Sequence, residues 1–287
     1  MADLEILGAK ISDMDMVETV CTLAAYIDLG RQLQGDAGQL HHVVTLNAEI
    51  LYKAQSDAAL LDIINRAALV TPDGSGIVMA VQKLCGREIE RVTGIDLMLE
   101  LCRRSAACGW RVYLLGAKPG VAEAAALKLE QDFGTLVCGW HDGYFKEEDQ
   151  AWIIGEINEK KPDILFVAMG APRQDFWIDS NRERLHVPLV MGVGGCYDVI
   201  SGNVKRAPVF FQRMGIEWLW RLLCEPWRWR RMLALPKFML LVNKDARRRR
   251  QAALELTARL NQRSQNEAAE RIKDKNKDNK REKKLPK

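Results

Sequence analysis

One carboxylate, Asp73, stands at the end of an apolar run, between Pro72 and Gly74. Held on such a stiff turn, a carboxylate can take a proton from an attacking hydroxyl group while a leaving group departs from the opposite side. That is general-base catalysis of a direct displacement. The same tripeptide also suits an ordinary turn, in which the aspartate serves only its own backbone. Taken alone, these three residues favour the turn.

Four further polar clusters also follow apolar runs. They are Thr45-Leu-Asn-Ala-Glu49, Arg91-Val-Thr-Gly94, Gly170-Ala-Pro-Arg-Gln-Asp175 and Gly194-Gly-Cys-Tyr-Asp198. In open α/β sheets, the residues just beyond the carboxyl ends of the strands line the ligand crevice. The series therefore predicts that all five clusters converge on one active site at one edge of a sheet.

Residues of two clusters have both a structural and a functional interpretation. Thr45 or Asn47, between a strand and a helix, suits an ordinary N-cap, but a cap needs one residue and this cluster supplies three polar groups. Arg91 can bind a phosphate or carboxylate group bidentately, which lysine does less well. A surface ion pair with Glu88 or Glu90 is the alternative for this arginine.

Two positions suit the phosphates of a nucleotide. Gln174 lies in the first turn of an expected helix, where Pro172 fits and free N–H groups favour a phosphate. Gly116 follows a strand and opens a helix, so its segment can cradle part of a nucleotide. Neither this segment nor Gly192-Val-Gly-Gly195 completes the dinucleotide fingerprint G-x-G-x-x-G, which disfavours a Rossmann oxidoreductase.

Patterns typical of metal sites are sparse. Asp13-Met-Asp15 superficially matches the Asp-x-Asp motif of many nucleotide-sugar transferases, but it precedes the sheet and better suits a helix N-cap. The seven cysteines are an odd number without metal-ligand spacing, so we expect them to be reduced and mostly buried, as in a cytoplasmic protein. We expect no metal site and no cofactor.

Short apolar runs alternate with helix-like stretches, and these elements must position the clusters. Strands are expected at 42–46, 68–71, 112–115, 136–138, 164–169 and 189–193, where nearly every residue is apolar, as in parallel strands covered on both faces. Helices are expected at 49–67, 76–84, 95–108, 121–132, 147–160 and 173–184. The alternation predicts an α/β fold with a Rossmann-like, mostly parallel, doubly wound sheet. A hairpin or edge strand and a helix from Asp13 should precede it.

Charge is divided unevenly along the chain. Residues 1–204 carry 18 lysines and arginines against 29 acidic residues, a balance of −11, whereas residues 205–287 carry 24 against 9, a balance of +15. Basic tails often only keep a protein in solution. A charge this uneven also suggests an anionic partner, such as a membrane, a nucleic acid or a phosphate-bearing substrate.

The basic quarter begins with a segment rich in tryptophan and arginine. Residues 210–242 hold four of the eight tryptophans, and Arg221, Arg228 and Arg231 fall on one face if the segment is helical. Interleaved tryptophan and arginine suit an interfacial membrane segment, and a helix that merely covers the core is the alternative. Residues 252–260 suit a short helix, and the chain after residue 266 is expected to be disordered.

The N-terminal residues lack the pattern of a signal peptide, and no run approaches the ~20 apolar residues that cross a bilayer. From about Ile6 to Arg231, the five clusters and the later motifs Lys205-Arg-Ala-Pro208, Glu217-Trp-Leu-Trp-Arg221 and Glu225-Pro-Trp-Arg228 resemble the WecG/TagA/CpsF family of bacterial glycosyltransferases. The resemblance implies an inverting, metal-independent enzyme that moves a sugar from a UDP-sugar to a polyprenyl-diphosphate-linked N-acetylglucosamine.

The same resemblance implies a pathway and a location. The implied sugar is N-acetylmannosamine or its uronic acid, in teichoic acid or other surface polysaccharide synthesis, and UDP-glucose in capsule or exopolysaccharide assembly is the alternative. The implied location is peripheral, on the cytoplasmic face of the bacterial inner membrane, where anionic lipid is a partner. Self-association remains open, and no nucleic acid partner is implied.

By resemblance, Asp73 is the catalytic base, with Thr45 and Gln174 acting beside it. Substrate-binding candidates are Asn47, Arg91, Gly116, Arg173, Asp198, Arg206, Arg221, Arg228 and Arg231. Family members usually carry Glu where this chain has Asp175, which weakens any role carried over to that position. The implied organisation is a catalytic domain at 1–203, a helical appendage at 204–242 that closes the site and docks on the membrane, and a disordered basic tail at 243–287.

Two functions of other classes are compatible with parts of the sequence. A nucleic-acid-binding protein would use the basic tail and the tryptophans, but it leaves the five clusters without a role. A catalytically idle scaffold for a membrane partner would bind a nucleotide sugar without turnover.

Overall fold

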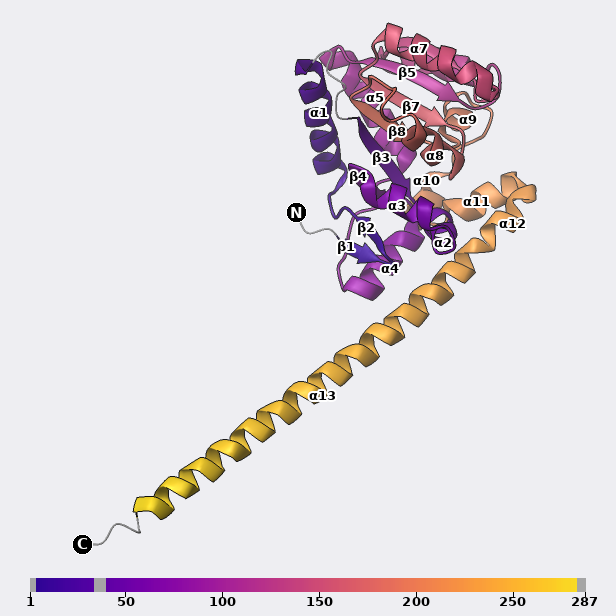
Figure 1. Cartoon of the computed structure of the whole chain (residues 1–287). Coiled ribbons are helices and arrows are strands. Elements are labelled where there is room, and N and C mark those ends of the chain that lie inside the picture. Colours follow the sequence, from indigo (N-terminus) through magenta and orange to yellow (C-terminus); the bar gives the residue numbers. More distant parts are fainter. Residues whose placement is uncertain (1–3, 34–39, 283–287) are drawn as a thin grey trace. The chain divides into compact units, whose positions relative to one another are not determined.

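The computed structural model describes residues 4–33 and 40–282 of the 287, without the side chains of Arg213, Arg228 and residues 262–282. The chain forms two compact units, residues 1–240 and 241–287. Among the described residues, the first holds both β-sheets, α1 to α12 and the start of α13, and the second holds the rest of α13 (Figure 1).

A six-stranded sheet forms the centre of the first unit. The strands are β3 (His41–Leu46), β4 (Leu69–Pro72), β5 (Arg111–Gly116), β6 (Leu136–His141), β7 (Ile164–Ala168) and β8 (Leu189–Gly192). They lie in the order β4-β3-β8-β7-β5-β6, and every neighbouring pair is parallel. All strands except the edge strand β6 are buried along almost their whole length, which explains why most of their residues are apolar. The parallel sheet confirms the predicted α/β fold.

Helices cover both faces of this sheet. On one face, α1 (Met16–Gln32), α5 (Gly94–Cys108), α6 (Val121–Phe133) and α9 (Cys196–Ile200) pack on the strands around residues such as Leu101 and Phe166. On the other face, α7 (Gln150–Lys160) and α8 (Arg173–Ser180) pack around residues such as Ile157 and Leu165. Because neighbouring residues of β7 point to opposite faces, Leu165 and Phe166 belong to separate cores.

A hairpin and a capped helix precede the central sheet. The hairpin of β1 (Leu4–Ile6) and β2 (Ala9–Ile11) precedes α1, as predicted. Asp15 caps α1 by accepting a hydrogen bond from the Glu18 backbone N–H at 2.8 Å, which confirms its assignment as an N-cap.

The single helix predicted at 49–67 is wrong in one respect. It is two helices, α2 (Ala48–Ala54) and α3 (Ala58–Arg66), because Asp57 leaves the helical conformation and caps α3 through the Leu60 N–H at 3.1 Å. Between β4 and α5 lies α4 (Ser75–Cys85). Helix α8 ends at Ser180, four residues before the predicted end.

Short helices follow the sheet. They are α10 (Val209–Arg213), α11 (Glu217–Cys224), the 3-10 turn η2 (Pro226–Arg228) and α12 (Trp229–Met232), and a second 3-10 turn, η1 (Glu147–Asp149), precedes α7. Residues 204–240 belong to the same compact unit as the sheet. In the part of the chain that the structure describes, no helix is both long and apolar enough to cross a bilayer.

The C-terminal residues differ from the predicted disordered tail. Helix α13 runs through Ala234–Glu282, so residues 243–282 are helical, and residues 283–287 lie outside the described part. Alanine, arginine, lysine, glutamine and glutamate have high intrinsic helix propensity. Ion pairs one turn apart, such as Arg249 with Asp245 at 2.8 Å, also favour the helix. Helix formation here therefore needs little buried apolar surface.

Candidate active site

A cavity of about 470 Å³ lies at the carboxyl ends of the strands. Its wall combines residues that follow β3, β4, β7 and β8 with residues of the segment 204–231. Nine of the twelve predicted site residues line it, namely Thr45, Asn47, Asp73, Arg173, Gln174, Asp198, Arg206, Arg221 and Arg231. The parallel sheet thus brings together clusters that are far apart in the sequence.

Asp73 is fixed by its own backbone at the end of β4. Its N–H donates to the carbonyl groups of Leu46 at 2.9 Å and Thr71 at 3.0 Å. Gly74, with φ of +93°, then turns the chain into α4 in a conformation that favours glycine. The carboxylate is therefore presented to the cavity from a rigid turn.

The surroundings of Asp73 make it an unusually strong base for an aspartate. Burial raises its pKa from 3.8 to about 6, although a hydrogen bond from the Gly94 backbone and the charge of Arg91 act in the opposite direction. The charges of Glu217 and Asp96 contribute to the increase. At neutral pH such a group is mostly ionised, and its pKa lies close enough to the working pH for efficient general-base catalysis.

Thr45 and Asn47 both line the cavity, and each makes a structural hydrogen bond. The Thr45 hydroxyl donates to the Gly192 carbonyl at 3.2 Å, which joins the ends of β3 and β8. The Asn47 side-chain oxygen accepts from the Ile50 N–H at 3.0 Å, so Asn47 is the N-cap of α2. The capping role considered for this cluster is correct for Asn47, which also lines the cavity.

Gln174 connects two loops of the site. Its buried side-chain oxygen accepts hydrogen bonds from the backbone N–H groups of Gly170 at 3.1 Å and Gly194 at 3.0 Å. Its amide nitrogen packs so closely on Gly192 that a Cβ atom added there would lie 2.4 Å away. The sequence suggested a donor to phosphate or sugar, and the structure adds a bracing role that the motif does not reveal.

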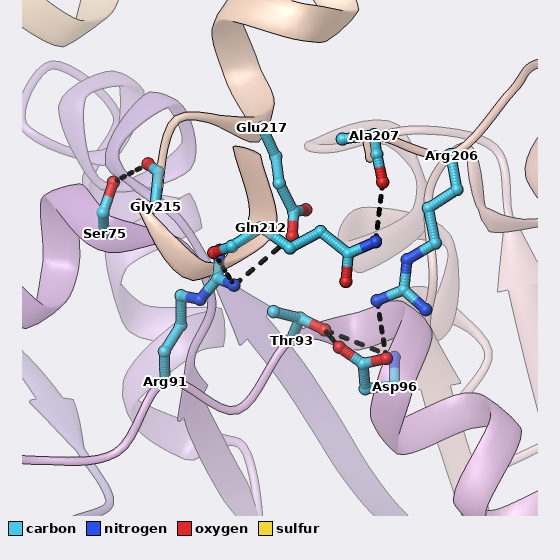
Figure 2. Close-up of polar contacts among 9 residues, drawn as sticks. All are labelled: Ser75, Arg91, Thr93, Asp96, Arg206, Ala207, Gln212, Gly215 and Glu217. Carbon is cyan, nitrogen blue, oxygen red and sulfur yellow. Dashed lines mark hydrogen bonds and ion pairs between the residues drawn. The ribbon is translucent and has the colours of Figure 1, made fainter. Parts of the chain in front are cut away.

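Arg91 does not line the cavity. Its Nη2 donates to the Gln212 carbonyl at 3.0 Å and lies 3.3 Å from the Glu217 carboxylate (Figure 2). The partner is therefore in α11, far from Glu88 and Glu90 in the sequence. These contacts attach the segment 204–217 to the central sheet and the helices that cover it, here called the catalytic body. The sequence analysis predicted a contact with substrate for Arg91 instead.

Three arginines of the C-terminal segment line the cavity, and each contacts an acidic side chain. Arg206 lies 2.6 Å from Asp96, and Arg221 lies 3.4 Å from Glu225. Arg221 also donates to the Gly195 carbonyl at 3.4 Å. Because these guanidinium groups border open space, they can contact a bound anion without leaving the cavity wall.

Arg231 makes a two-pronged ion pair with Glu49. Its Nε and Nη2 each lie 3.0 Å from a carboxylate oxygen, and Lys53 binds the same carboxylate at 2.8 Å. Burial works to raise the pKa of Glu49, but hydrogen bonds and charge from Arg231 and Lys53 outweigh it and lower the pKa. Glu49 therefore fixes Arg231 at the rim of the cavity.

Two further predicted residues have different outcomes. Gly116 lies outside the lining and is required by packing, because a Cβ atom there would lie 2.5 Å from the carbonyl carbon of Ala168. Its neighbours Ala117 and Lys118 do line the cavity. The side chain of Arg228 lies outside the described part of the structure.

The sequence analysis did not single out several lining residues. Thr93, Lys205, Glu217 and Trp220 lie within motifs that it quoted, whereas Lys118 and Tyr144 were not named. Lys118 and Tyr144 follow β5 and β6, so the strand-end rule that identified the five clusters could have found them. Together with Arg173, Arg206, Arg221 and Arg231, the two lysines give the wall more positive than negative side chains, which suits a phosphate-bearing ligand.

Asp175 is buried behind the cavity wall and faces His42 of β3. The His42 Nε2 atom lies 3.9 Å from an Asp175 carboxylate oxygen, which is too long for a hydrogen bond. Burial raises the pKa of Asp175 to about 7 and, with the charge of Arg182, lowers the pKa of His42 to about 3. An uncharged histidine makes this a polar contact and not a true ion pair.

Within the described residues, no three His, Cys, Asp or Glu side chains gather in a group that could hold a metal ion. Asp13, one half of the Asp-x-Asp pattern, pairs with Arg87 at 2.9 Å.

Known proteins match this chain over most of its length. The profile described as the glycosyl transferase WecG/TagA/CpsF family matches residues 4–252. Three relatives carry the name N-acetylglucosaminyldiphosphoundecaprenol N-acetyl-beta-D-mannosaminyltransferase. The protein of Bacillus spizizenii is 36% identical over 239 residues, which cover 83% of this chain and 91% of the relative. That of Bacillus subtilis is 34% identical over 209 residues, 72% of this chain and 81% of the relative.

The third relative, from Staphylococcus aureus, is 33% identical over 251 residues, which cover 88% of this chain and 96% of the relative. The family match, over residues 4–252, spans the sheet, every cluster of the cavity wall and the segment 204–231. The chain belongs to the WecG/TagA/CpsF family of glycosyl transferases, as the order of its polar clusters predicts.

Proposed function

We propose that this protein transfers an N-acetylmannosaminyl group to an N-acetylglucosamine that is carried on diphosphoundecaprenol. The names of the relatives describe this reaction. The observation that carries the proposal is Asp73, a carboxylate with a raised pKa on a rigid turn in the wall of a cavity of suitable size. We further propose a UDP-sugar as the donor, with UDP-N-acetylmannosamine as the first candidate.

The proposed reaction is a single displacement at the anomeric carbon of the donor sugar. The Asp73 carboxylate takes the proton of an acceptor hydroxyl group, whose oxygen forms a bond to the anomeric carbon. The bond from this carbon to the diphosphate breaks, and UDP leaves with the electron pair from the opposite face. The configuration of the anomeric carbon is therefore inverted, and Asp73 retains the proton until the products depart.

Cationic side chains are proposed to stabilise the departing diphosphate. Arg206, Arg221 and Arg231 line the same cavity as Asp73, and charge-assisted hydrogen bonds from guanidinium to phosphate are among the strongest available in proteins. In this proposal the arginines supply the charge that a divalent cation supplies in many other nucleotide-sugar enzymes. Turnover should then continue in the presence of a chelator.

We also propose that the segment 204–240 docks on the membrane that carries the acceptor. Several large apolar side chains of this segment are exposed, including Phe210, Leu223, Trp227 and Trp229. Tryptophan is favoured at the level of lipid headgroups, and neighbouring arginines attract anionic lipid. Docking through these residues would bring the cavity close to the lipid diphosphate.

The proposal is tested by measuring UDP release from purified full-length protein in detergent. The donors are UDP-N-acetylmannosamine, its uronic acid and UDP-glucose, each with and without a polyprenyl-diphosphate-linked N-acetylglucosamine analogue. Acceptor-dependent release from an N-acetylmannosamine donor is the expected result. Release from UDP-glucose alone would replace the proposed donor, and no release from folded protein with any donor would refute the proposed reaction.

A further inference from the structure

Two ion pairs of opposite orientation join the segment 204–217 to the catalytic body (Figure 2). In one pair the body supplies the cation, Arg91, and α11 supplies the carboxylate, Glu217, at 3.3 Å. In the other pair the body supplies the carboxylate, Asp96, and the segment supplies the cation, Arg206, at 2.6 Å. Both pairs require the segment 204–217 to pack against the catalytic body, and a segment packed in this way is called docked below.

The charges of these pairs act on Asp73. Arg91 works to lower its pKa, whereas Glu217 and Asp96 work to raise it. Cys196, whose own pKa is raised to about 12 by burial and the nearby Asp73, stays a neutral thiol over the working range. The charges that act on Asp73 are thus those of Arg91, Asp96 and Glu217, and Glu217 comes from the segment.

Among these charged groups, Arg91 has the largest effect on the pKa of Asp73. A guanidinium paired directly with a carboxylate lowers the pKa of that carboxylate strongly and occupies the oxygens that must accept a proton. In the structure, Nη2 of Arg91 instead contacts the Gln212 carbonyl at 3.0 Å and Glu217. Both acceptors belong to the docked segment.

We propose that Glu217 is a positioning residue for the base: it binds the Arg91 guanidinium and so prevents Arg91 from pairing with the Asp73 carboxylate. The inference rests on the proposed role of Asp73 as general base. It also implies that the base becomes effective only when the segment 204–217 is in place, since an undocked segment would leave Arg91 to pair with Asp73.

Other contacts also attach the segment 204–217 to the catalytic body, so the segment should stay in place when Glu217 is replaced. The Ser75 hydroxyl donates to the Gly215 carbonyl at 2.6 Å, and Arg206 pairs with Asp96 at 2.6 Å. Gly215, with φ of +68°, packs closely on Ser75, where an added Cβ atom would lie 2.9 Å away. Glu217→Gln keeps the shape of the side chain and removes only its charge, so we expect the variant to fold.

The first test is a ¹³C carboxyl NMR titration of Asp73 in the full-length chain, with the signal assigned by its loss in Asp73→Asn. Glu217→Gln should lower the titration midpoint of Asp73 by about 1 pH unit or more, because opposite charges at close range lower a carboxyl pKa by that amount. The acid limb of kcat/KM should move to lower pH by the same interval. Glu225→Gln, which removes the carboxylate partner of Arg221, is the matched control and should leave the midpoint unchanged.

Repeating Glu217→Gln in a chain that also carries Arg91→Gln separates two causes of a lower Asp73 midpoint, namely the release of Arg91 and the loss of the Glu217 charge itself. In Arg91→Gln, the further change Glu217→Gln should lower the midpoint by less than it does in the unaltered chain, because only the direct charge of Glu217 is then lost and no guanidinium is released toward Asp73. An equal fall in both backgrounds, or no fall in either, would overturn the proposal. The NMR midpoint does not depend on transfer activity. Full transfer by Asp73→Asn would therefore refute the assigned base, whereas the titration would still decide the relation between Glu217 and Arg91.

Discussion

Replacing Asp73 by asparagine removes one ionisable group and keeps the shape of the side chain. The amide cannot accept a proton from the acceptor hydroxyl, and positioned general bases contribute about 10²- to 10⁴-fold to the rate. We therefore expect Asp73→Asn to lower kcat by at least about 100-fold with little change in KM. The assay is acceptor-dependent UDP release in detergent.

The same substitution should increase stability, and this increase should depend on pH. The pKa of Asp73 is about 6 in the folded protein and 3.8 in the reference state, a difference that corresponds to at most about 3 kcal/mol. Because the folded pKa is raised, the folded state holds its proton more firmly than the unfolded state. The charged group therefore destabilises the fold fully above pH 6, and the penalty disappears as the pH falls from 6 to below 4.

Thermal unfolding of the two proteins across this range measures the effect. At pH 8, Asp73→Asn should unfold at a temperature that is higher by up to roughly 10 °C, since 1 kcal/mol shifts the midpoint by about 2–4 °C in a chain of this size. The half-buried carboxylate retains some hydration, so the shift should lie below this limit. At pH 4 the two midpoints should approach each other.

Two results would refute this reasoning. Retention of more than a few per cent of activity by Asp73→Asn would show that Asp73 is not the base. A stability difference of the same size at pH 4 and pH 8 would show that the carboxyl group has no raised pKa, whatever its role in transfer. The two measurements are independent, so each part of the argument can fail alone.

Three further predictions follow from the contacts of the site. Gly192→Ala should destabilise the protein by about 1–3 kcal/mol and lower activity, because the added methyl group meets the Gln174 amide; an unchanged melting temperature would contradict the bracing role. Trp227→Ser combined with Trp229→Ser should weaken sedimentation with anionic vesicles, whereas Trp152→Ser, an equally exposed tryptophan of α7, should not. If the double variant and Trp152→Ser both sediment like the unaltered protein, the membrane surface lies elsewhere. Transfer should be unaffected by EDTA, and complete inhibition that Mg²⁺ reverses would show that the arginines do not replace a metal.

Much of the fold can be predicted because its causes are local. The strands of the central sheet are apolar at nearly every position, as burial on both faces requires, and the capping pattern of Asp15 and Glu18 marks the start of α1. The convergence of the clusters follows from one topological rule, that parallel strands end at the same edge. These inferences need no knowledge of which distant residues meet.

The ion pairs of the site could not be predicted in this way. Arg91 and Glu217 are 126 positions apart, and Arg231 and Glu49 are 182 apart. Their pairing depends on how the segment after the sheet packs against the strand ends, and no local pattern encodes that packing. The break between α2 and α3 was missed for another reason, because the apolar periodicity continues across the Asp57 cap.

Gln174 has a consequence for how pH affects this protein. Its amide holds the loops after β7 and β8 through two backbone N–H groups, and none of these three groups gains or loses a proton between pH 4 and pH 10. A carboxylate in the same place would make the joint between the loops sensitive to acid. The brace therefore keeps the floor of the cavity constant while Asp73 changes charge. A rate profile recorded over this interval is then unaffected by any titration of the Gln174 brace itself.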